Sequence, residues 1–221
     1  MRQPMKLVED NFRRPAGWAG RAVGHLMAVQ HRSLTEWTID LMGIKPADRI
    51  LDVGCGGGMA VRLLARHAPQ GRVAGIDYSP EMVAQARSRN AAAVARQQVE
   101  IRPGNAMDLP YPDQSFDHVC AIETFYFWPD PLRGLAEAAR VLRPGGQVTV
   151  TLEMSREAAD PPTALQRVFG RKFTERQRED GLHIISGAEL TDLMVRAGLR
   201  DARFDSQPRR SLGWLCARAY R

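Results

Sequence analysis

The sequence predicts an α/β fold with a seven-stranded, mostly parallel sheet covered by helices on both faces. Two observations carry this prediction. From residue 49 onward, short apolar runs alternate with amphipathic stretches, a pattern typical of parallel strands joined by crossover helices. A glycine-rich turn at residues 54–58 directly follows the first of these runs. Such a turn is expected where a strand passes into a helix beside a bound ligand.

Each expected strand is an apolar run bounded by turn residues or by a helix signal. The first five cover residues 49–54, 72–77, 98–102, 118–122 and 147–152, and a closing pair covers 202–205 and 214–218. The alternation with helices places the first five strands in a parallel arrangement.

Helices are expected between these strands because their apolar residues recur at helical spacing. One covers residues 59–67 and another 186–197. A third begins at Ser79, the N-cap, with Pro80 at the first helical position. A fourth places Leu132, Leu135, Ala139 and Leu142 on one face and should end at residues 143–146, Arg-Pro-Gly-Gly.

Two segments lie outside the alternation. Residues 1–45 are expected to form an N-terminal helical cap on the main domain, which covers residues 46–221, and helical spacing predicts two helices within 15–43. Residues 155–185 are polar and irregular, with a short helix expected around 163–169. Because ligands bind beyond the carboxyl ends of the strands in such sheets, both segments are candidate lids. Simple packing against the edge of the sheet is an equally good interpretation.

The composition is that of an ordinary folded protein. Of 221 residues, 44% are hydrophobic and 25% charged, and the formal net charge is +6. The basic residues occur in scattered pairs rather than in one run, which disfavours a nucleic-acid partner. No secretory signal and no apolar run of the ~20 residues needed to cross a bilayer is visible. We therefore expect a cytoplasmic protein without a transmembrane segment, either a monomer or a homodimer.

Two acidic residues near the glycine-rich turn indicate which kind of ligand it can bind. Asp52 precedes it, and Asp77 ends the second strand. A carboxylate beside a pyrophosphate would repel it, but a carboxylate can bind an ammonium group. Asp77 can accept hydrogen bonds from both hydroxyls of a ribose. An amino acid joined to a nucleoside without phosphates satisfies both acids, and S-adenosylmethionine is such a molecule.

The stretch from Ile50 to Leu152 resembles the class I S-adenosylmethionine-dependent methyltransferases, in particular the bacterial branch with ubiquinone/menaquinone-type and small-molecule enzymes. Five blocks in the family's order carry the resemblance: Leu-Asp-Val-Gly-Cys-Gly-Gly-Gly (51–58), Gly-Ile-Asp-Tyr-Ser-Pro-Glu-Met (75–82), Gly-Asn-Ala-Met-Asp-Leu-Pro-Tyr (104–111), Ser-Phe-Asp-His-Val (115–119) and Arg-Val-Leu-Arg-Pro-Gly-Gly (140–146). The resemblance implies a Rossmann-like fold with N-terminal lid helices, and S-adenosyl-L-methionine as the cofactor.

The resemblance also implies a role for individual residues. The methionine end of the cofactor would lie on the turn and the ribose on Asp77. The adenine would lie near Tyr78 and Met82, with Asn105 and Ala106 at its edge, and the sulfonium beside the end of the fourth strand. The implied cofactor-binding residues are Asp52, Gly54, Cys55, Gly56, Asp77, Tyr78, Met82, Asn105, Ala106, Ile122 and Thr124. Many relatives have Asp where this chain has Asn105, whose amide carbonyl is a weaker acceptor for the adenine amino group.

The candidates for catalysis are Glu123, Tyr126 and His31. Glu123 and His31 are possible proton acceptors, and the Tyr126 hydroxyl could orient a substrate. Four consecutive aromatics, 125–128, follow the fourth strand, and we expect Tyr126 or Trp128 to line the pocket. Because the cofactor is itself a strong electrophile, positioning without a base is the preferred mechanism. No sequence spacing predicts a metal site.

The sequence therefore favours methyl transfer from S-adenosylmethionine to a carbon, oxygen or nitrogen atom of a small molecule. RNA or protein methylation is the alternative suggested by the charge of +6. A third interpretation is a protein that binds the cofactor without catalysis, since a fold alone does not establish an activity.

Overall fold

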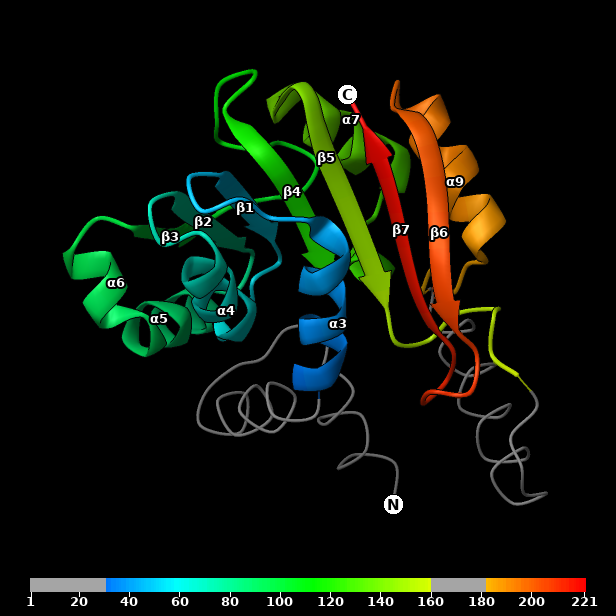
Figure 1. Ribbon diagram of the computed structural model, residues 1–221, viewed down its shortest axis with the longest axis horizontal. Coiled ribbons are helices and arrows are strands. Elements are labelled where there is room, and N and C mark those ends of the chain that lie inside the picture. Colours follow the sequence, from blue (N-terminus) through cyan, green and yellow to red (C-terminus); the bar gives the residue numbers. More distant parts are fainter. Residues whose placement is uncertain (1–30, 160–181) are drawn as a thin grey trace.

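The computed structural model describes residues 31–159 and 182–221. Its centre is a seven-stranded sheet in the order β3-β2-β1-β4-β5-β7-β6 (Figure 1). The strands are β1 (Arg49–Val53), β2 (Arg72–Asp77), β3 (Val99–Pro103), β4 (Phe116–Ile122), β5 (Leu142–Leu152), β6 (Arg200–Gln207) and β7 (Trp214–Tyr220). The strands β1 to β5 pair in parallel, and β7 is antiparallel to both of its neighbours. The predicted seven-stranded, mostly parallel, Rossmann-like sheet is confirmed.

Helices cover both faces of the sheet. They are α3 (Arg32–Met42), α4 (Met59–His67), α5 (Pro80–Arg89), α6 (Ala91–Ala95), α7 (Pro131–Val141) and α9 (Gly187–Arg196), with a short 3-10 helix η1 at Phe125–Phe127. Apolar residues of α3, α4, α5 and α6 pack into one core, and those of α7 and α9 pack into another. None of these described helices is long and apolar enough to cross a membrane.

The two cores follow from the alternation of side chains along a strand. In β1, Ile50 belongs to the core beneath α3 and α4, whereas Leu51 belongs to the core beneath α7 and α9. In β4, Cys120 and Val119 divide in the same way. Strands that are buried on both faces are nearly continuous in apolar residues, which explains why the sequence shows these runs so clearly.

Most predicted elements lie where expected, including the helix at 59–67 and the Ser79 cap, whose hydroxyl accepts the Met82 N–H. One boundary is different. The Pro-Gly-Gly at 144–146 does not separate a helix from a strand, because β5 already begins at Leu142. Leu142 pairs with Phe116, and Gly145 and Gly146 exchange hydrogen bonds with the backbone of Arg221. Pairing with a distant strand therefore extends β5 through the glycines. The expected helix around 163–169 and the first part of 15–43 lie outside the described residues.

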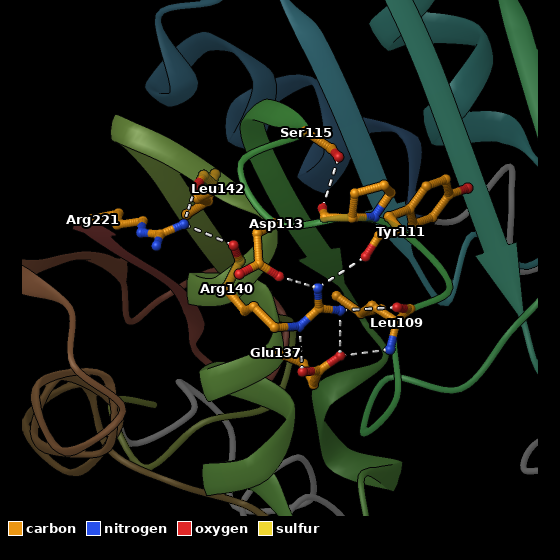
Figure 2. Close-up of polar contacts among 9 residues, drawn as sticks. Leu109, Tyr111, Asp113, Ser115, Glu137, Arg140, Leu142 and Arg221 are labelled. Carbon is orange, nitrogen blue, oxygen red and sulfur yellow. Dashed lines mark hydrogen bonds and ion pairs between the residues drawn. The ribbon is translucent and has the colours of Figure 1, made fainter.

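One arginine anchors the loop that leads from β3 to β4. The guanidinium of Arg140, on α7, donates to the carbonyls of Leu109 and Tyr111 and forms ion pairs with Asp113 and Glu137 (Figure 2). Glu137 in turn accepts the Leu109 N–H at 2.8 Å. This cluster holds the segment that follows Asn105 against α7, which explains an arginine at the start of the block at 140–146.

We expect Arg140→Ala to lower the free energy of unfolding by about 2–3 kcal/mol, because two backbone carbonyls lose a charged donor and Glu137 loses its partner. The value is modest because the ion pair with Asp113 is largely exposed and therefore weak. Urea denaturation measures the change. Arg133→Ala removes an exposed arginine from the same helix and should cost less than 0.5 kcal/mol. Equal losses in the two variants would contradict the anchoring role.

Candidate cofactor and acceptor site

A cavity of about 490 Å³ lies at the carboxyl ends of β1, β2 and β4, where the strand order reverses between β1 and β4. All the residues that the resemblance implies for the cofactor line this cavity: Asp52, Gly54, Cys55, Gly56, Asp77, Tyr78, Met82, Asn105, Ala106, Ile122 and Thr124. Of the candidates for catalysis, His31 and Glu123 line it, and Tyr126 is not among its lining residues. The cavity is also lined by Thr35, Met59 and Arg89, which no sequence motif indicated.

The glycine-rich turn joins β1 to α4 through backbone in the left-handed region, with φ of 78° at Gly54 and 50° at Gly56. The N–H groups of Gly54 and Cys55 both donate to the carbonyl of Ile76 at 2.8 Å, which ties the turn to β2. A Cβ at Gly54 would lie 2.1 Å from Oγ1 of Thr124, whereas one at Gly56 would meet nothing within 4 Å. Gly54 thus allows close packing on Thr124, and Gly56 leaves open space beside the turn.

Asp77 is held at the end of β2 by backbone donors. Its Oδ2 accepts the Gly56 N–H at 2.8 Å, and its Oδ1 accepts the Ser79 N–H at 2.9 Å. Burial raises the pKa of this carboxyl, and the backbone hydrogen bonds partly oppose the rise. Each oxygen of a carboxylate has a further lone pair. Asp77 can therefore bind the two hydroxyls of a ribose while it holds the turn in place.

Asp52 is a buried acid with an unused oxygen. Its side chain is 1% exposed, and Oδ2 has no hydrogen-bond partner among the described residues. Oδ1 accepts only a weak hydrogen bond from the thiol of Cys120 at 3.7 Å. Burial raises the pKa of Asp52 to about 7. A buried acceptor without a donor is costly, so this oxygen fits the ammonium group of an amino acid, and it does not fit a phosphate.

Residues that follow β2 and β3 in the chain also line the cavity. Tyr78 is 66% exposed, and it lines the cavity together with Met82, Asn105 and Ala106. Oδ1 of Asn105 accepts the Met107 N–H at 3.0 Å. This hydrogen bond uses one of the two lone pairs of the amide oxygen, and the second lone pair could accept from another donor.

Glu123 occupies a strained position directly after β4. Its φ of 60° is rare for a residue with a side chain. Its N–H donates to the carbonyl of Thr151, and its Oε1 accepts the Tyr126 hydroxyl at 3.2 Å and the N–H of Glu153. Burial raises the pKa of Glu123 to about 7. The strain is maintained by these contacts, which hold the carboxyl at the rim of the cavity.

His31 and Glu153 join Glu123 from two other elements. His31 precedes α3, Glu153 follows β5, and the Nε2 and Oε2 atoms of the pair are 3.0 Å apart. Burial lowers the pKa of His31, but the hydrogen bond with Glu153 and the charges of both glutamates raise it overall. Ligating atoms of all three residues lie within 4.8 Å of one another. No motif links these distant positions, so Glu153 could not be found from sequence patterns.

The four aromatics after β4 divide between core and cavity. Phe125, Tyr126 and Trp128 are at most 4% exposed, whereas Phe127 is 38% exposed. Phe127 and Trp128 line the cavity, so the expectation for Trp128 agrees with its position. The Tyr126 hydroxyl accepts the Met154 N–H at 2.7 Å and donates to Glu123. The Tyr126 hydroxyl therefore contacts Glu123 and the backbone, and Tyr126 is not among the residues that line the cavity.

The sheet is doubly wound, and Asp52, Asp77 and the glycine-rich turn form a cofactor cradle where its strand order reverses. This combination is typical of the α/β proteins that bind S-adenosylmethionine. Comparison with known proteins agrees. Residues 51–150 match the family described as Methyltransferase domain. The chain is 32% identical to the demethylmenaquinone methyltransferase of Shouchella clausii, over 85% of this chain and 84% of that protein.

Two further similarities extend this finding. The chain is 39% identical to the 27-O-demethylrifamycin SV methyltransferase of Amycolatopsis mediterranei, over 79% of this chain and 60% of that one. A chain in the complex between the Haloferax volcanii Trm112 methyltransferase activator and a methyltransferase has a TM-score of 0.76 and 26% identity, over 92% and 95% of the two chains. The chain belongs to the S-adenosylmethionine-dependent methyltransferases, and S-adenosylmethionine is its cofactor.

Proposed function

We propose that this protein transfers the methyl group of S-adenosylmethionine to a small molecule by in-line displacement. The cavity supports this proposal because it is lined by the residues expected for the cofactor and also by His31, Glu123, Phe127 and Trp128, which would form its acceptor end. A cavity of about 490 Å³ is within the size range of small-molecule sites. The names of two relatives, a menaquinone and a rifamycin methyltransferase, also suggest small acceptors.

The residues of the chain act mainly by positioning. The cofactor supplies an electrophilic methyl group, and Asp52 and Asp77 would hold its amino-acid and ribose ends. Ile122 and Thr124 would lie beside its sulfur, at the end of β4. An acceptor held in line with the carbon–sulfur bond gains roughly 7–11 kcal/mol from alignment alone. Burial of both reactants excludes water from the reacting atoms.

We propose roles at the acceptor end for the three candidates from the sequence. Glu123 lines the cavity with a carboxyl that can accept a proton near neutral pH. His31 lies beside it, and the buried Tyr126 orients it through a hydrogen bond. An acceptor that enters without an acidic proton needs only the alignment.

Labelled S-adenosylmethionine tests the proposal. The purified full chain should bind the cofactor and transfer label to a member of a metabolite extract, detected by mass spectrometry. Extracts of total RNA and of protein are assayed in parallel. Label in RNA or protein, with none in any small molecule, would refute the proposal in favour of a macromolecular acceptor. Tight cofactor binding without label in any pool would identify a non-catalytic binding protein.

A further inference from the structure

One tryptophan in the wall of the cavity is held in place from two sides. Trp128 lines the cavity, although the residue is only 4% exposed. On one side its indole packs on the ring of Phe125, which is completely buried, with 5.3 Å between the ring centroids. The Trp128 N–H donates to the carbonyl of Phe125 at 3.2 Å, which closes the 3-10 helix η1. Phe125 therefore fixes both the backbone and one side of the indole.

The second side of the indole rests on a glycine inside a helix. Gly134 is the fourth residue of α7, and its φ is not positive. Alanine is a better helix former than glycine, so the helical backbone does not require glycine here. A Cβ at this position would lie 2.4 Å from Cε3 and 2.7 Å from Cζ3 of Trp128. The indole thus occupies the space that a side chain of residue 134 would need.

The helix on which the indole rests is fixed at its start. Oδ1 of Asp130 accepts the Arg133 N–H at 3.0 Å, and the carbonyl of Asp130 accepts the Gly134 N–H at 3.0 Å. The next residue, Leu135, is completely buried in the core beneath α7. A side chain added at position 134 would therefore move the indole more readily than the helix. Because Phe125 blocks one side, the indole would move toward the cavity.

We propose that Gly134 is a positioning residue that sets, through Trp128, the size of the group that the acceptor end admits. Gly134 itself is not among the residues that line the cavity. Two carbon atoms in contact are about 3.5–4.0 Å apart, so relief of a 2.4 Å contact would carry the edge of the indole by about 1 Å or more. A shift of that size into the cavity would narrow it. The inference rests on the proposed small-molecule function and adds a determinant of acceptor size.

Stability tests the contact between the glycine and the indole. Alanine in place of glycine normally stabilises a helix, but here overpacking should dominate, and Gly134→Ala should lower the folding equilibrium constant roughly 10- to 100-fold. Trp128→Phe removes the ring that carries Cε3 and Cζ3, and in that background Gly134→Ala should cost nothing or stabilise the chain. Urea denaturation of the native chain, both single variants and the double variant measures these effects. If Gly134→Ala stabilises the native chain, or costs the same in both backgrounds, the proposal fails.

Binding tests the consequence for the cavity. The full chain, saturated with S-adenosylhomocysteine, is titrated by calorimetry with phenol and 2-naphthol, two flat neutral probes of different size. Gly134→Ala should weaken binding of 2-naphthol about tenfold and of phenol less than about threefold, while the affinity for S-adenosylhomocysteine stays within about twofold. Adding Trp128→Phe should restore the binding of 2-naphthol. Arg133→Ala, at an exposed position on the same helix, should change none of these affinities.

Three results would overturn the inference while the proposed function stands. Equal changes in the affinities for the two probes, or no change in either, would show that the indole does not limit size. Weaker binding of S-adenosylhomocysteine in Gly134→Ala would place Trp128 against the cofactor instead. A native chain that does not bind 2-naphthol would show that the indole does not border a space of that size. Failure of the proposed function is distinct, because it appears as label confined to RNA or protein in the extract assay.

Discussion

Gly54→Ala should abolish measurable cofactor binding and lower the free energy of unfolding by more than about 3 kcal/mol. The new Cβ would lie 2.1 Å from Oγ1 and 2.6 Å from Cβ of Thr124, so the turn and the end of β4 must separate. The φ of 78° adds a backbone cost of about 1–2 kcal/mol. Calorimetric titration with S-adenosylhomocysteine and urea denaturation measure the two effects.

A matched variant separates the contact from the backbone conformation. Gly145 has nearly the same φ, 79°, but a Cβ there would meet nothing within 4 Å. Gly145→Ala should therefore show only the backbone cost and retain cofactor binding. Adding Thr124→Gly to Gly54→Ala removes the clashing side chain and should recover part of the stability. If the Gly54 and Gly145 variants lose the same stability, close packing on Thr124 is not what requires glycine.

Asp52→Asn should weaken binding of S-adenosylmethionine by about 100-fold. The buried Oδ2 has no donor among the described residues, and we expect it to accept the ammonium of the cofactor. Replacing a charged acceptor by an amide loses roughly 1.5–3 kcal/mol. In addition, the amide NH₂ of the asparagine would be a donor facing the ammonium of the cofactor, which is itself a donor. Asp40→Asn, at an exposed position on α3, is the control. Unchanged affinity in Asp52→Asn would place the ammonium elsewhere.

The same residue should make cofactor binding depend on pH. Because burial raises the pKa of Asp52 to about 7, the carboxylate that attracts an ammonium is lost as the pH falls below 7. Affinity should therefore decrease on acidification from pH 8 to pH 6 in the native chain and stay nearly flat in Asp52→Asn. The ionisable groups around Asp52 are Asp77, Cys55 and Cys120, and the variant retains all three.

The stability of the protein should change in the opposite sense. An acid whose folded-state pKa is raised from 3.8 to about 7 destabilises the fold as the pH rises through that window, because the unfolded chain releases the proton first. Without ligand, Asp52→Asn should thus be more stable than the native chain above pH 7, by up to about 4 kcal/mol. The gain should vanish near pH 4. A variant equally stable at both pH values would show that Asp52 titrates normally.

The cofactor half of the site was predictable because its residues are local in sequence. Gly54 and Gly56 belong to one turn, and Asp77 ends the next strand, so the motif and the strand order together place them. Parallel strands that are buried on both faces are continuous in apolar residues, which marks β1, β2 and β4 clearly. The extension of β5 through Gly145 and Gly146 was missed, because pairing with Arg221 overrides the tendency of glycine to end an element.

The acceptor half was not predictable in the same way. Glu123 was a candidate because it follows the fourth strand, and His31 because it lies in the expected N-terminal cap, but nothing in the sequence linked either one to Glu153. Their contact requires α3 to lie beside the ends of β4 and β5, and it requires the left-handed backbone at Glu123 that turns its carboxyl back onto the N–H of Glu153. Sequence patterns report periodicity and short spacings, but they do not report distances between separate elements.

The sequence by itself determined the sheet, the glycine-rich turn and the two acids of the cofactor cradle, because each depends on neighbouring residues and on burial along one strand. Only the tertiary structure decided which side chains meet at the acceptor end. Long-range packing brings His31, Glu123 and Glu153 together, and packing of that kind leaves no periodic signal in the chain.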